Sequence, residues 1–315
     1  MITKHIKTAI FLSLVGTLVN VSLVKANVDM GTGNSVAGTD NVVSGSTNNV
    51  WGQRSDVSGA RNQVSGNDNV VTGADNTVAG SGTLTVGISN NVQIGATSSI
   101  VGGQTNTVNG VNSLVGGNQN AIGYGGANNT ISGYANRIND GVQNSQAIGM
   151  GNTVTGNNAF TSGTGNTVAG NNNIAFGSGV SVGGINSLGL GSANSVGGAN
   201  NLVSGDTNNV QGSRASVSGA RNTVSGNDNV VTGADNNVVG SGVLAVGTGN
   251  TTQNAATNSV VSGERNSTDS RNSLVGGNQN TIGYGGANNT ISGYANRIND
   301  GVQNSQAIGM GNTVT

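Results

Sequence analysis

A glycine recurs at every seventh residue over two long stretches of this chain. One run has eight members, from Gly38 to Gly87, and a second has fifteen, from Gly149 to Gly247. Many of these glycines close a five-residue phrase, Asn-x-Val-x-Gly, as in residues 62–66. A fixed short period indicates a stacked repeat architecture, in which each repeat packs only against its neighbours.

The same period excludes a helix. Glycine costs about 1 kcal/mol per helical site relative to alanine, so twenty-three glycines would cost roughly 20 kcal/mol. In a strand, by contrast, the Asn, Val and Gly of the phrase point to one face. We therefore expect an all-β fold in which Val64, Val71 and Val78 stack in successive layers. Each heptad provides a short strand and a tight turn, because Gly and Asn tolerate the backbone angles of turns. Two heptads form a flat coil of about 14 residues in a parallel β-solenoid.

The residue three places before each glycine distinguishes alternate heptads. One set is largely apolar and consists of Val42, Asp56, Val70 and Leu84. The other set is polar and consists of Asn49, Gln63 and Thr77. The two strands of a coil are therefore expected to differ, with one outer face more apolar than the other. A core one residue wide and an apolar outer face both favour association along the rod.

The first 26 residues have the pattern of a signal peptide. Lys4 and Lys7 precede an apolar stretch, and Val24-Lys25-Ala26 resembles a small-residue cleavage site. We expect cleavage after Ala26 and secretion of residues 27–315. That segment contains eight Arg and twelve acidic residues, a net charge of −4, and no Lys, His, Cys or Pro.

This composition excludes several functions. No basic patch exists to neutralise phosphates, so nucleic acid is not an expected partner. Without Cys or His, residues 27–315 lack the usual general bases, a thiol nucleophile and thiolate metal ligands. Asp56, Asp68 and Asp75 are interpreted as turn residues rather than paired catalytic carboxylates. We expect no enzyme activity, no cofactor and no metal site.

A longer repeat overlies the heptads. Residues 35–84 recur at 195–244 and residues 111–155 recur at 271–315, both with an offset of 160. Because 160 exceeds a multiple of seven by six, six residues are inserted per unit, between Gly87 and Gly149. These interruptions of the seven-residue spacing predict bulges or small loops. Such loops could present functional residues, or they could be neutral insertions. The chain stops in mid-phrase at Thr315, and we expect it to be part of a longer protein.

The stretch from residue 144 to 200 resembles the head repeats of trimeric autotransporter adhesins, the YadA-like family. It contains Asn-Ser-Gln-Ala-Ile-Gly at 144–149 and Gly-Asn-Thr-Val-Thr-Gly at 151–156. The resemblance implies a left-handed parallel β-roll assembled as a homotrimer. It also implies a bacterial outer-membrane location, through an anchor absent from this chain, and multivalent adhesion to host matrix or cell-surface molecules.

The resemblance also indicates residues for adhesion or trimer packing. Ala147 is expected to point inward and Ile148 outward, with Phe176 and Leu190 at the same phase as Ile148. The candidates are Asn144, Ser145, Ala147, Ile148, Gly149, Phe176, Leu190, Asn304, Ser305, Ala307, Ile308 and Gly309.

Three further residues are candidates for display. Trp51 could anchor a partner, while Arg54 and Arg61 could bind a ligand or act as solvated charge. Arg61 and Asp68 lie one heptad apart, so we expect them on neighbouring strands or layers. An ice-binding or purely structural solenoid is the alternative function. Ice binding requires threonines in regular ranks. No single position of the seven-residue repeat is shared by Thr72, Thr77, Thr83 and Thr85.

Overall fold

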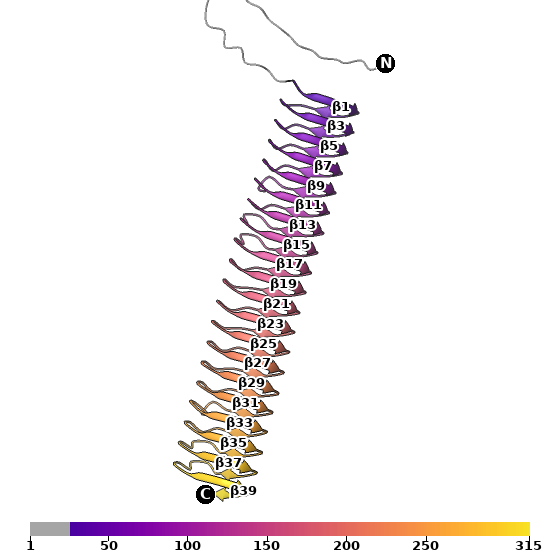
Figure 1. Ribbon diagram of the computed structural model, residues 1–315. Helices are drawn as coiled ribbons and strands as arrows, with labels where there is room; N and C mark the ends of the chain where they lie inside the picture. The colour runs from indigo at the N-terminus through magenta and orange to yellow at the C-terminus, as the bar shows by residue number, and fades with distance from the viewer. Residues whose placement is uncertain (1–25) are drawn as a thin grey trace, which may run out of the picture.

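The computed structural model describes residues 26–315, which form a thin rod of twenty stacked coils (Figure 1). The fold expectation is confirmed: the described residues form a parallel β-solenoid and contain no helix. The expected signal peptide, residues 1–26, lies outside the described residues except for Ala26. At the usual strand spacing of about 4.8 Å, twenty coils make a rod about 90 Å long.

Every coil contains one five-residue strand and one two-residue strand. The long strands are β1 (Val28–Thr32), β3 (Val42–Ser46), β5 (Asp56–Ala60), β7 (Val70–Ala74), β9 (Leu84–Ile88), β11 (Ile100–Gln104), β13 (Leu114–Asn118), β15 (Thr130–Tyr134), β17 (Gln146–Met150), β19 (Phe160–Thr164), β21 (Ile174–Ser178), β23 (Leu188–Ser192), β25 (Leu202–Asp206), β27 (Ser216–Ala220), β29 (Val230–Ala234), β31 (Leu244–Thr248), β33 (Val260–Glu264), β35 (Leu274–Asn278), β37 (Thr290–Tyr294) and β39 (Gln306–Met310). The short strands are β2 (Ser35–Val36), β4 (Asn49–Val50), β6 (Gln63–Val64), β8 (Thr77–Val78), β10 (Asn91–Val92), β12 (Thr107–Val108), β14 (Ala121–Ile122), β16 (Arg137–Ile138), β18 (Thr153–Val154), β20 (Thr167–Val168), β22 (Ser181–Val182), β24 (Ser195–Val196), β26 (Asn209–Val210), β28 (Thr223–Val224), β30 (Asn237–Val238), β32 (Thr251–Thr252), β34 (Ser267–Thr268), β36 (Thr281–Ile282), β38 (Arg297–Ile298) and β40 (Thr313–Val314).

The long strands form one parallel sheet and the short strands another, here called the long-strand sheet and the short-strand sheet. Val64 pairs with Val78 in the short-strand sheet, as expected for residues stacked in successive coils. The expected position of Val71 was wrong, because it pairs with Val57 in the long-strand sheet. The error arises because adjacent heptads form opposite walls of one coil rather than successive layers.

The core is a file of small apolar side chains between the two sheets. The second residue of each strand points inward, so that Val57 and Val64 are fully buried. The first and third residues of the long strands point outward, and Val42, Val70 and Leu84 are exposed there. The prediction of two unequal outer faces is therefore confirmed.

Buried asparagines occupy the corner that joins each long strand to the following short strand. Asn62 is typical: its Nδ2 donates to the Gly73 carbonyl at 2.9 Å and to the Asn48 Oδ1 at 3.0 Å. Its own Oδ1 accepts the backbone amide and the Nδ2 of Asn76, at 3.1 and 3.0 Å. We call this rank the asparagine ladder. Its members are Asn34, Asn48, Asn62, Asn76, Asn90, Asn106, Asn120, Asn136, Asn152, Asn166, Asn194, Asn208, Asn222, Asn236, Asn250, Asn266, Asn280, Asn296 and Asn312, with Val180 at the remaining coil. All are buried except Asn34 and Asn312, in the two end coils.

Glycine is required where successive coils approach most closely. Gly59 has a φ of 122°, which other residues rarely adopt. A Cβ added there would collide with the carbonyl oxygen of Gly73 in the next coil. The alternate glycines of the period follow the short strands, where a Cβ on Gly66 would likewise collide with the Gly80 carbonyl oxygen. The seven-residue glycine period therefore has a steric cause at two places in each coil.

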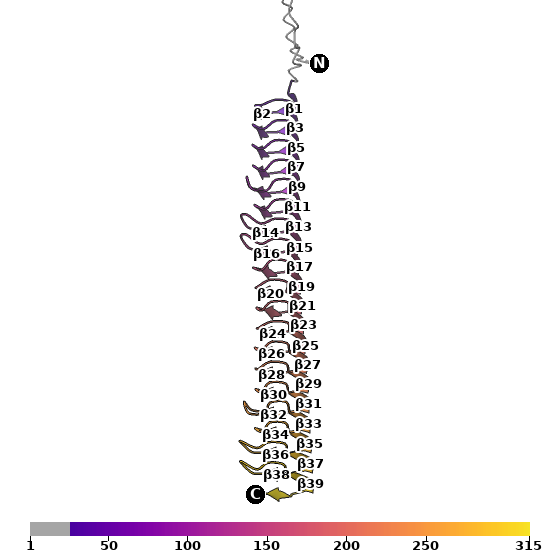
Figure 2. The same ribbon diagram turned by 90° about the vertical axis from the view of Figure 1, so that its left-hand side faces the viewer.

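Six coils have sixteen residues instead of fourteen, which explains the slips in the sequence period. For example, Leu84 pairs with Ile100, and Thr130 pairs with Gln146. The extra residues widen the turn after a short strand, at 94–95, 124–125, 140–141, 254–255, 284–285 and 300–301. Figure 2 shows these turns projecting in two groups beyond the short-strand sheet. Each 160-residue unit contains three such coils, which account for its six inserted residues.

Within residues 26–315, no helix is long and apolar enough to cross a membrane.

Replacement of a ladder asparagine tests its contribution to stability. In Asn222→Val, the Gly233 carbonyl loses a hydrogen bond of 2.9 Å and the Asn236 amide loses one of 3.1 Å. Each buried group left unpaired costs about 1–3 kcal/mol, so we expect a loss of roughly 2–6 kcal/mol. Urea unfolding followed by circular dichroism measures it.

The adjacent exposed residue provides the control. Asn209→Val changes an outward side chain of the short-strand sheet and should alter stability by less than about 0.5 kcal/mol. Equal losses in the two variants would contradict a special contribution from the asparagine ladder.

Candidate functional site

The outer surface of the short-strand sheet presents two ranks of side chains. In Asn-x-Val-x-Gly the Asn and Val point inward, so the two x residues point outward on either side of the Val. Every residue in the first of these ranks is at least partly exposed. Twelve of the twenty carry a hydroxyl: Ser35, Thr77, Thr107, Thr153, Thr167, Ser181, Ser195, Thr223, Thr251, Ser267, Thr281 and Thr313.

The widened turns leave one long part of this surface uninterrupted. Between the turns at 140–141 and 254–255, seven successive fourteen-residue coils carry no charged or aromatic residue in either outward rank. We call this surface the flat run. Its outward residues are Thr153, Thr155, Thr167, Ala169, Ser181, Gly183, Ser195, Gly197, Asn209, Gln211, Thr223, Ser225, Asn237 and Val239. The rank positions repeat every ~4.8 Å along the rod and lie about 6.6 Å apart across it.

The threonines of residues 72–85 do not reveal this rank, because they belong to one short segment of the sequence. The structure confirms that no single position in the coil is shared by Thr72, Thr77, Thr83 and Thr85. Thr72 lies on the outside of the long-strand sheet, Thr77 lies on the outside of the short-strand sheet, and Thr83 and Thr85 are buried. Alignment of the Asn-x-Val phrases across the sixteen-residue coils would have found the rank.

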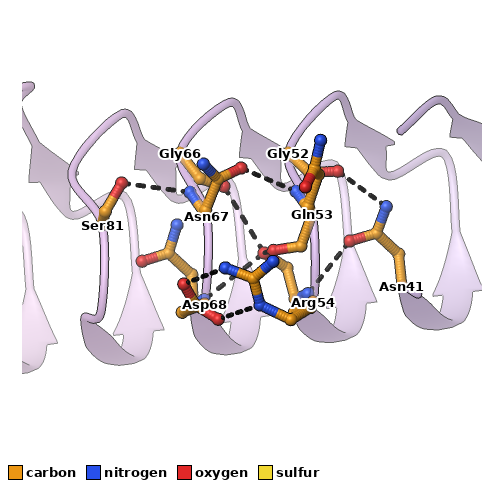
Figure 3. A network of polar contacts seen from close by, with 10 residues as sticks. Asn41, Gly52, Gln53, Arg54, Gly66, Asn67, Asp68 and Ser81 are labelled. Atoms are coloured by element: carbon orange, nitrogen blue, oxygen red, sulfur yellow. Dashed lines mark hydrogen bonds and ion pairs between the residues drawn. The ribbon is translucent and has the colours of Figure 1, made fainter. Parts of the chain in front are cut away.

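Polar contacts also join successive coils at the edge of the short-strand sheet in the first unit (Figure 3). The Asn67 Oδ1 accepts the Gln53 amide at 2.9 Å, and the Ser81 Oγ accepts the Asn67 amide at 3.1 Å. In the same corner, Arg54 donates from Nε and Nη2 to both carboxylate oxygens of Asp68, at 2.6 and 2.7 Å. Side chains of one coil thus bind backbone and side-chain groups of the next.

The two candidate arginines belong to such pairs. Arg61 binds Asp75 in the next coil, at 2.7 Å, rather than Asp68 on the opposite corner. Arg214–Asp228 and Arg221–Asp235 repeat the arrangement in the second unit. Asp68 and Asp75 both have positive φ, as expected for turn residues, but the same expectation was wrong for Asp56, which is the first residue of β5. All eight side chains are at least about two-fifths exposed, so these pairs act mainly in coil-to-coil alignment.

The guanidinium groups change the titration of their partners. The hydrogen bond from Arg54 lowers the pKa of Asp68 below its ordinary value, and Arg61 does the same to Asp75. Correspondingly, the hydrogen bond from Asp68 raises the pKa of Arg54. Any stabilisation from the pair is present above the ordinary carboxyl pKa and is lost as pH falls through the lowered one.

Two widened turns in each unit are joined into one protrusion. Tyr124 is 69% exposed at the tip of the first turn, and its amide donates to the Asp140 Oδ1 of the second turn at 3.0 Å. The Gly141 amide donates to the Tyr124 carbonyl at 2.8 Å. Tyr284 and Asp300 repeat this contact at 3.1 Å in the second unit. In each unit, the two widened turns therefore expose an aromatic ring, and hydrogen bonds between the turns support it.

Asn144 and Ser145 have structural partners. Asn144 lies on an outer corner with a φ of 55° and donates to the Asn158 Oδ1 at 3.2 Å. It belongs to an exposed chain of amide hydrogen bonds through Asn112, Asn128, Asn144, Asn158, Asn172, Asn186 and Asn200. Ser145 is buried, and its Oγ donates to the Gln143 and Gly156 carbonyls at 3.0 Å.

The other candidates of this phrase separate into inward and outward positions. Ala147 is buried, and Ile148 lies half-buried on the outer side of the long-strand sheet. Ile148, Phe176 and Leu190 share one rank, with Ser162 between the first two. Gly149 adopts a φ of 112°.

The same phrase in the last coils has the same arrangement. Asn304 lies on the outer corner and accepts the Asn288 Nδ2 at 3.0 Å. Ala307 is buried and Ile308 is exposed. Ser305 Oγ donates to the Gln303 carbonyl at 3.0 Å, and Gly309 has a φ of 115°.

Trp51 lies on the short-strand sheet, whereas Ile148 lies on the long-strand sheet. It is half exposed in the second outward rank of the short-strand sheet, where the second unit has Gln211. Within residues 26–315, no three His, Cys, Asp or Glu side chains form a group suited to a metal ion.

Loss of one guanidinium should change the titration of its partner alone. In Arg54→Gln we expect the pKa of Asp68 to rise toward its ordinary value, because the hydrogen bond that lowers it is lost. The pKa of Asp75 should not change, since Arg61 is intact. Carboxyl carbon shifts followed by NMR during an acid titration measure both. An unchanged Asp68 would contradict the pairing.

Comparison with known families finds a match near the start of the chain. A family model described as grass antifreeze beta roll matches residues 13–87. The match spans less than half of the chain, and its described part covers the first coils of the rod. No curated protein sequence matches the chain. The matching family differs from the adhesin heads that the repeats at 144–200 resemble.

Proposed function

We propose that this protein binds ice, through the flat run of the short-strand sheet. The observation that carries the proposal is the regular spacing of small hydroxyl and amide side chains over seven coils without a charge. From Thr153 to Asn237 this surface extends about 29 Å, at one rank position per ~4.8 Å. That repeat is close to the spacing of oxygen atoms in lattice planes of ice.

Rigidity and weak hydration make such a surface suitable. An ice crystal presents a fixed lattice, so a complementary surface must hold its groups in place before contact. Six of the seven coils of the flat run carry a ladder asparagine, with Val180 in the seventh, and bonds such as Asn222 Nδ2 to the Asn208 Oδ1, at 2.9 Å, join successive coils at this corner. Charged groups hold their hydration water strongly and would disturb an ordered layer of water.

The similarity to the grass antifreeze beta roll supports this proposal. The described part of the match includes residues 35–84, which recur at 195–244 within and just beyond the flat run. The second unit thus repeats the matched coils and continues the same outward ranks.

A bulky charge in the centre of the flat run should weaken ice binding. Ser181 is exposed and its side chain forms no hydrogen bond with other described residues, so Ser181→Arg should fold normally. We expect thermal hysteresis to fall several-fold, because the guanidinium would hold the surface away from the lattice. Hysteresis is measured on single ice crystals with a nanolitre osmometer.

A matched substitution on the corner provides the control. Thr207→Arg adds the same side chain at an exposed corner position that Arg221 occupies one coil later. Its hysteresis should equal that of the parent chain. Absence of hysteresis in the parent chain, or equal loss in both variants, would contradict the proposal.

Surface adhesion is a second candidate, favoured by the two protruding tyrosines. Tyr124 and Tyr284 lie eleven coils apart, which is about 53 Å, and have the same rigid support. Two identical sites on one rod could bind a repetitive surface with high avidity. As an adhesin, the chain would be exported by residues 1–26 and act as a homotrimer. It would act at the bacterial surface, and its targets would be host matrix or cell-surface molecules.

Removal of the rings tests adhesion. Tyr124→Ala and Tyr284→Ala should each weaken retention on immobilised extracellular matrix proteins, and the double variant should lose more than the sum. Tyr134→Ala, an exposed tyrosine of β15 outside the protrusions, serves as the control. Surface plasmon resonance measures retention. If the parent chain is not retained, or the double variant equals it, adhesion through these rings is wrong.

A further inference from the structure

The outer surface of the long-strand sheet carries a rank of mostly large apolar side chains. Its first outward rank, formed by the first residues of the long strands, has large apolar side chains in fourteen of twenty coils. These are Val28, Val42, Val70, Leu84, Ile100, Leu114, Phe160, Ile174, Leu188, Leu202, Val230, Leu244, Val260 and Leu274. Most of them are between one-third and one-half exposed in the isolated chain.

The second outward rank, formed by the third residues, is mostly small. Thirteen of its twenty members are Ser, Thr or Gly: Ser44, Ser58, Thr72, Gly102, Gly116, Ser132, Ser162, Ser204, Ser218, Thr232, Ser262, Gly276 and Ser292. A ridge of large side chains thus lies beside a furrow of small ones. Among the forty residues of the two ranks, Asp56 is the one with a charge.

We infer that this surface binds a second copy of the chain, with the two rods parallel and related by a two-fold axis along their length. Under that symmetry the strands of the two copies run in opposite directions. The first rank of each copy can then face the second rank of the other, so that Val230 lies over Thr232 of the second copy. Large side chains enter the furrow on both sides, as in well-packed sheet interfaces.

The other face-to-face two-fold arrangement is less favourable. With antiparallel rods, the strands of both copies run the same way, and the first rank faces the first rank. Leu and Val side chains would then meet tip to tip, leaving the furrows empty. The alternation of large and small ranks therefore selects parallel rods.

The available area and the charge pattern fit a stable pair. The two ranks span three residues of each strand, so twenty strands give a paired surface of about 90 by 10 Å, or roughly 900 Å² per copy. A standard stable interface needs about 800 Å² per partner. The two ranks also lack charge apart from Asp56, which would lie opposite a hydroxyl, Ser58 of the second copy.

Sedimentation equilibrium at micromolar concentration tests the pairing. We expect the parent chain to have twice the mass of one chain. In Leu202→Arg/Val230→Arg, two charges would be buried in the interface, so the dissociation constant should rise about tenfold or more. Both residues are exposed in the single chain, so circular dichroism should be unchanged. Ser181→Arg, on the opposite sheet, should leave the mass unaffected even where ice binding is weakened.

Introduced cysteines test the geometry, because the natural chain has no cysteine. A mixture of Val230→Cys and Thr232→Cys chains, oxidised by dissolved oxygen, should form a disulfide between unlike chains. Val230→Cys alone should form little. A mixture with Asn237→Cys, on the other sheet, is the control. A single-chain mass for the parent, a three-chain mass, or preferred linkage between two Val230→Cys chains would overturn the inference.

Discussion

The side-chain amide of one buried asparagine per coil sets the geometry on which the rest of the rod depends. Most ladder amides bind the coil on either side, as Asn62 does through Gly73, Asn48 and Asn76. Buried backbone groups at the corners would otherwise lack partners, at a cost larger than the net gain of an ordinary hydrogen bond. Nineteen of twenty coils carry an asparagine at this corner, so the same contacts between coils repeat along nearly the whole rod. Straight outer ranks follow from this repetition.

Much of the fold could be predicted from the sequence because glycine and asparagine have backbone reasons for their positions. The coil of about fourteen residues, the unequal faces and the loops at the slips all followed from them. The placement of Val71 and the Arg61–Asp75 pair did not, because a heptad argument treats opposite walls as successive layers. The hydroxyl rank was missed for a related reason: two-residue insertions shift the phase, and only pairing across coils restores it. Asn144 showed the limit of motif reasoning, since its side chain bonds to its neighbours in an amide chain.

The two sheets share one core yet offer different chemistry to the outside. Inward positions are constrained to Val, Ile, Ala and a few small polar residues, whereas outward positions affect neither core nor ladder. On the short strands these positions carry hydroxyl and amide groups, and on the long strands they carry a ridge and a furrow. A surface suited to ordered water and a surface suited to another protein can thus occupy opposite sides of a rod two strands thick. If two rods pair through their long-strand sheets, both short-strand sheets remain open to solvent.

The length of the internal repeat has an evolutionary consequence. Eight coils of fourteen and three of sixteen residues make 160, so the repeat contains a whole number of coils. Unequal recombination between the near-identical units would add or remove eleven coils at once and leave every rank in phase across the junction. A gene of this kind can change the length of its product, and with it the number of surface sites, without refolding any part of it.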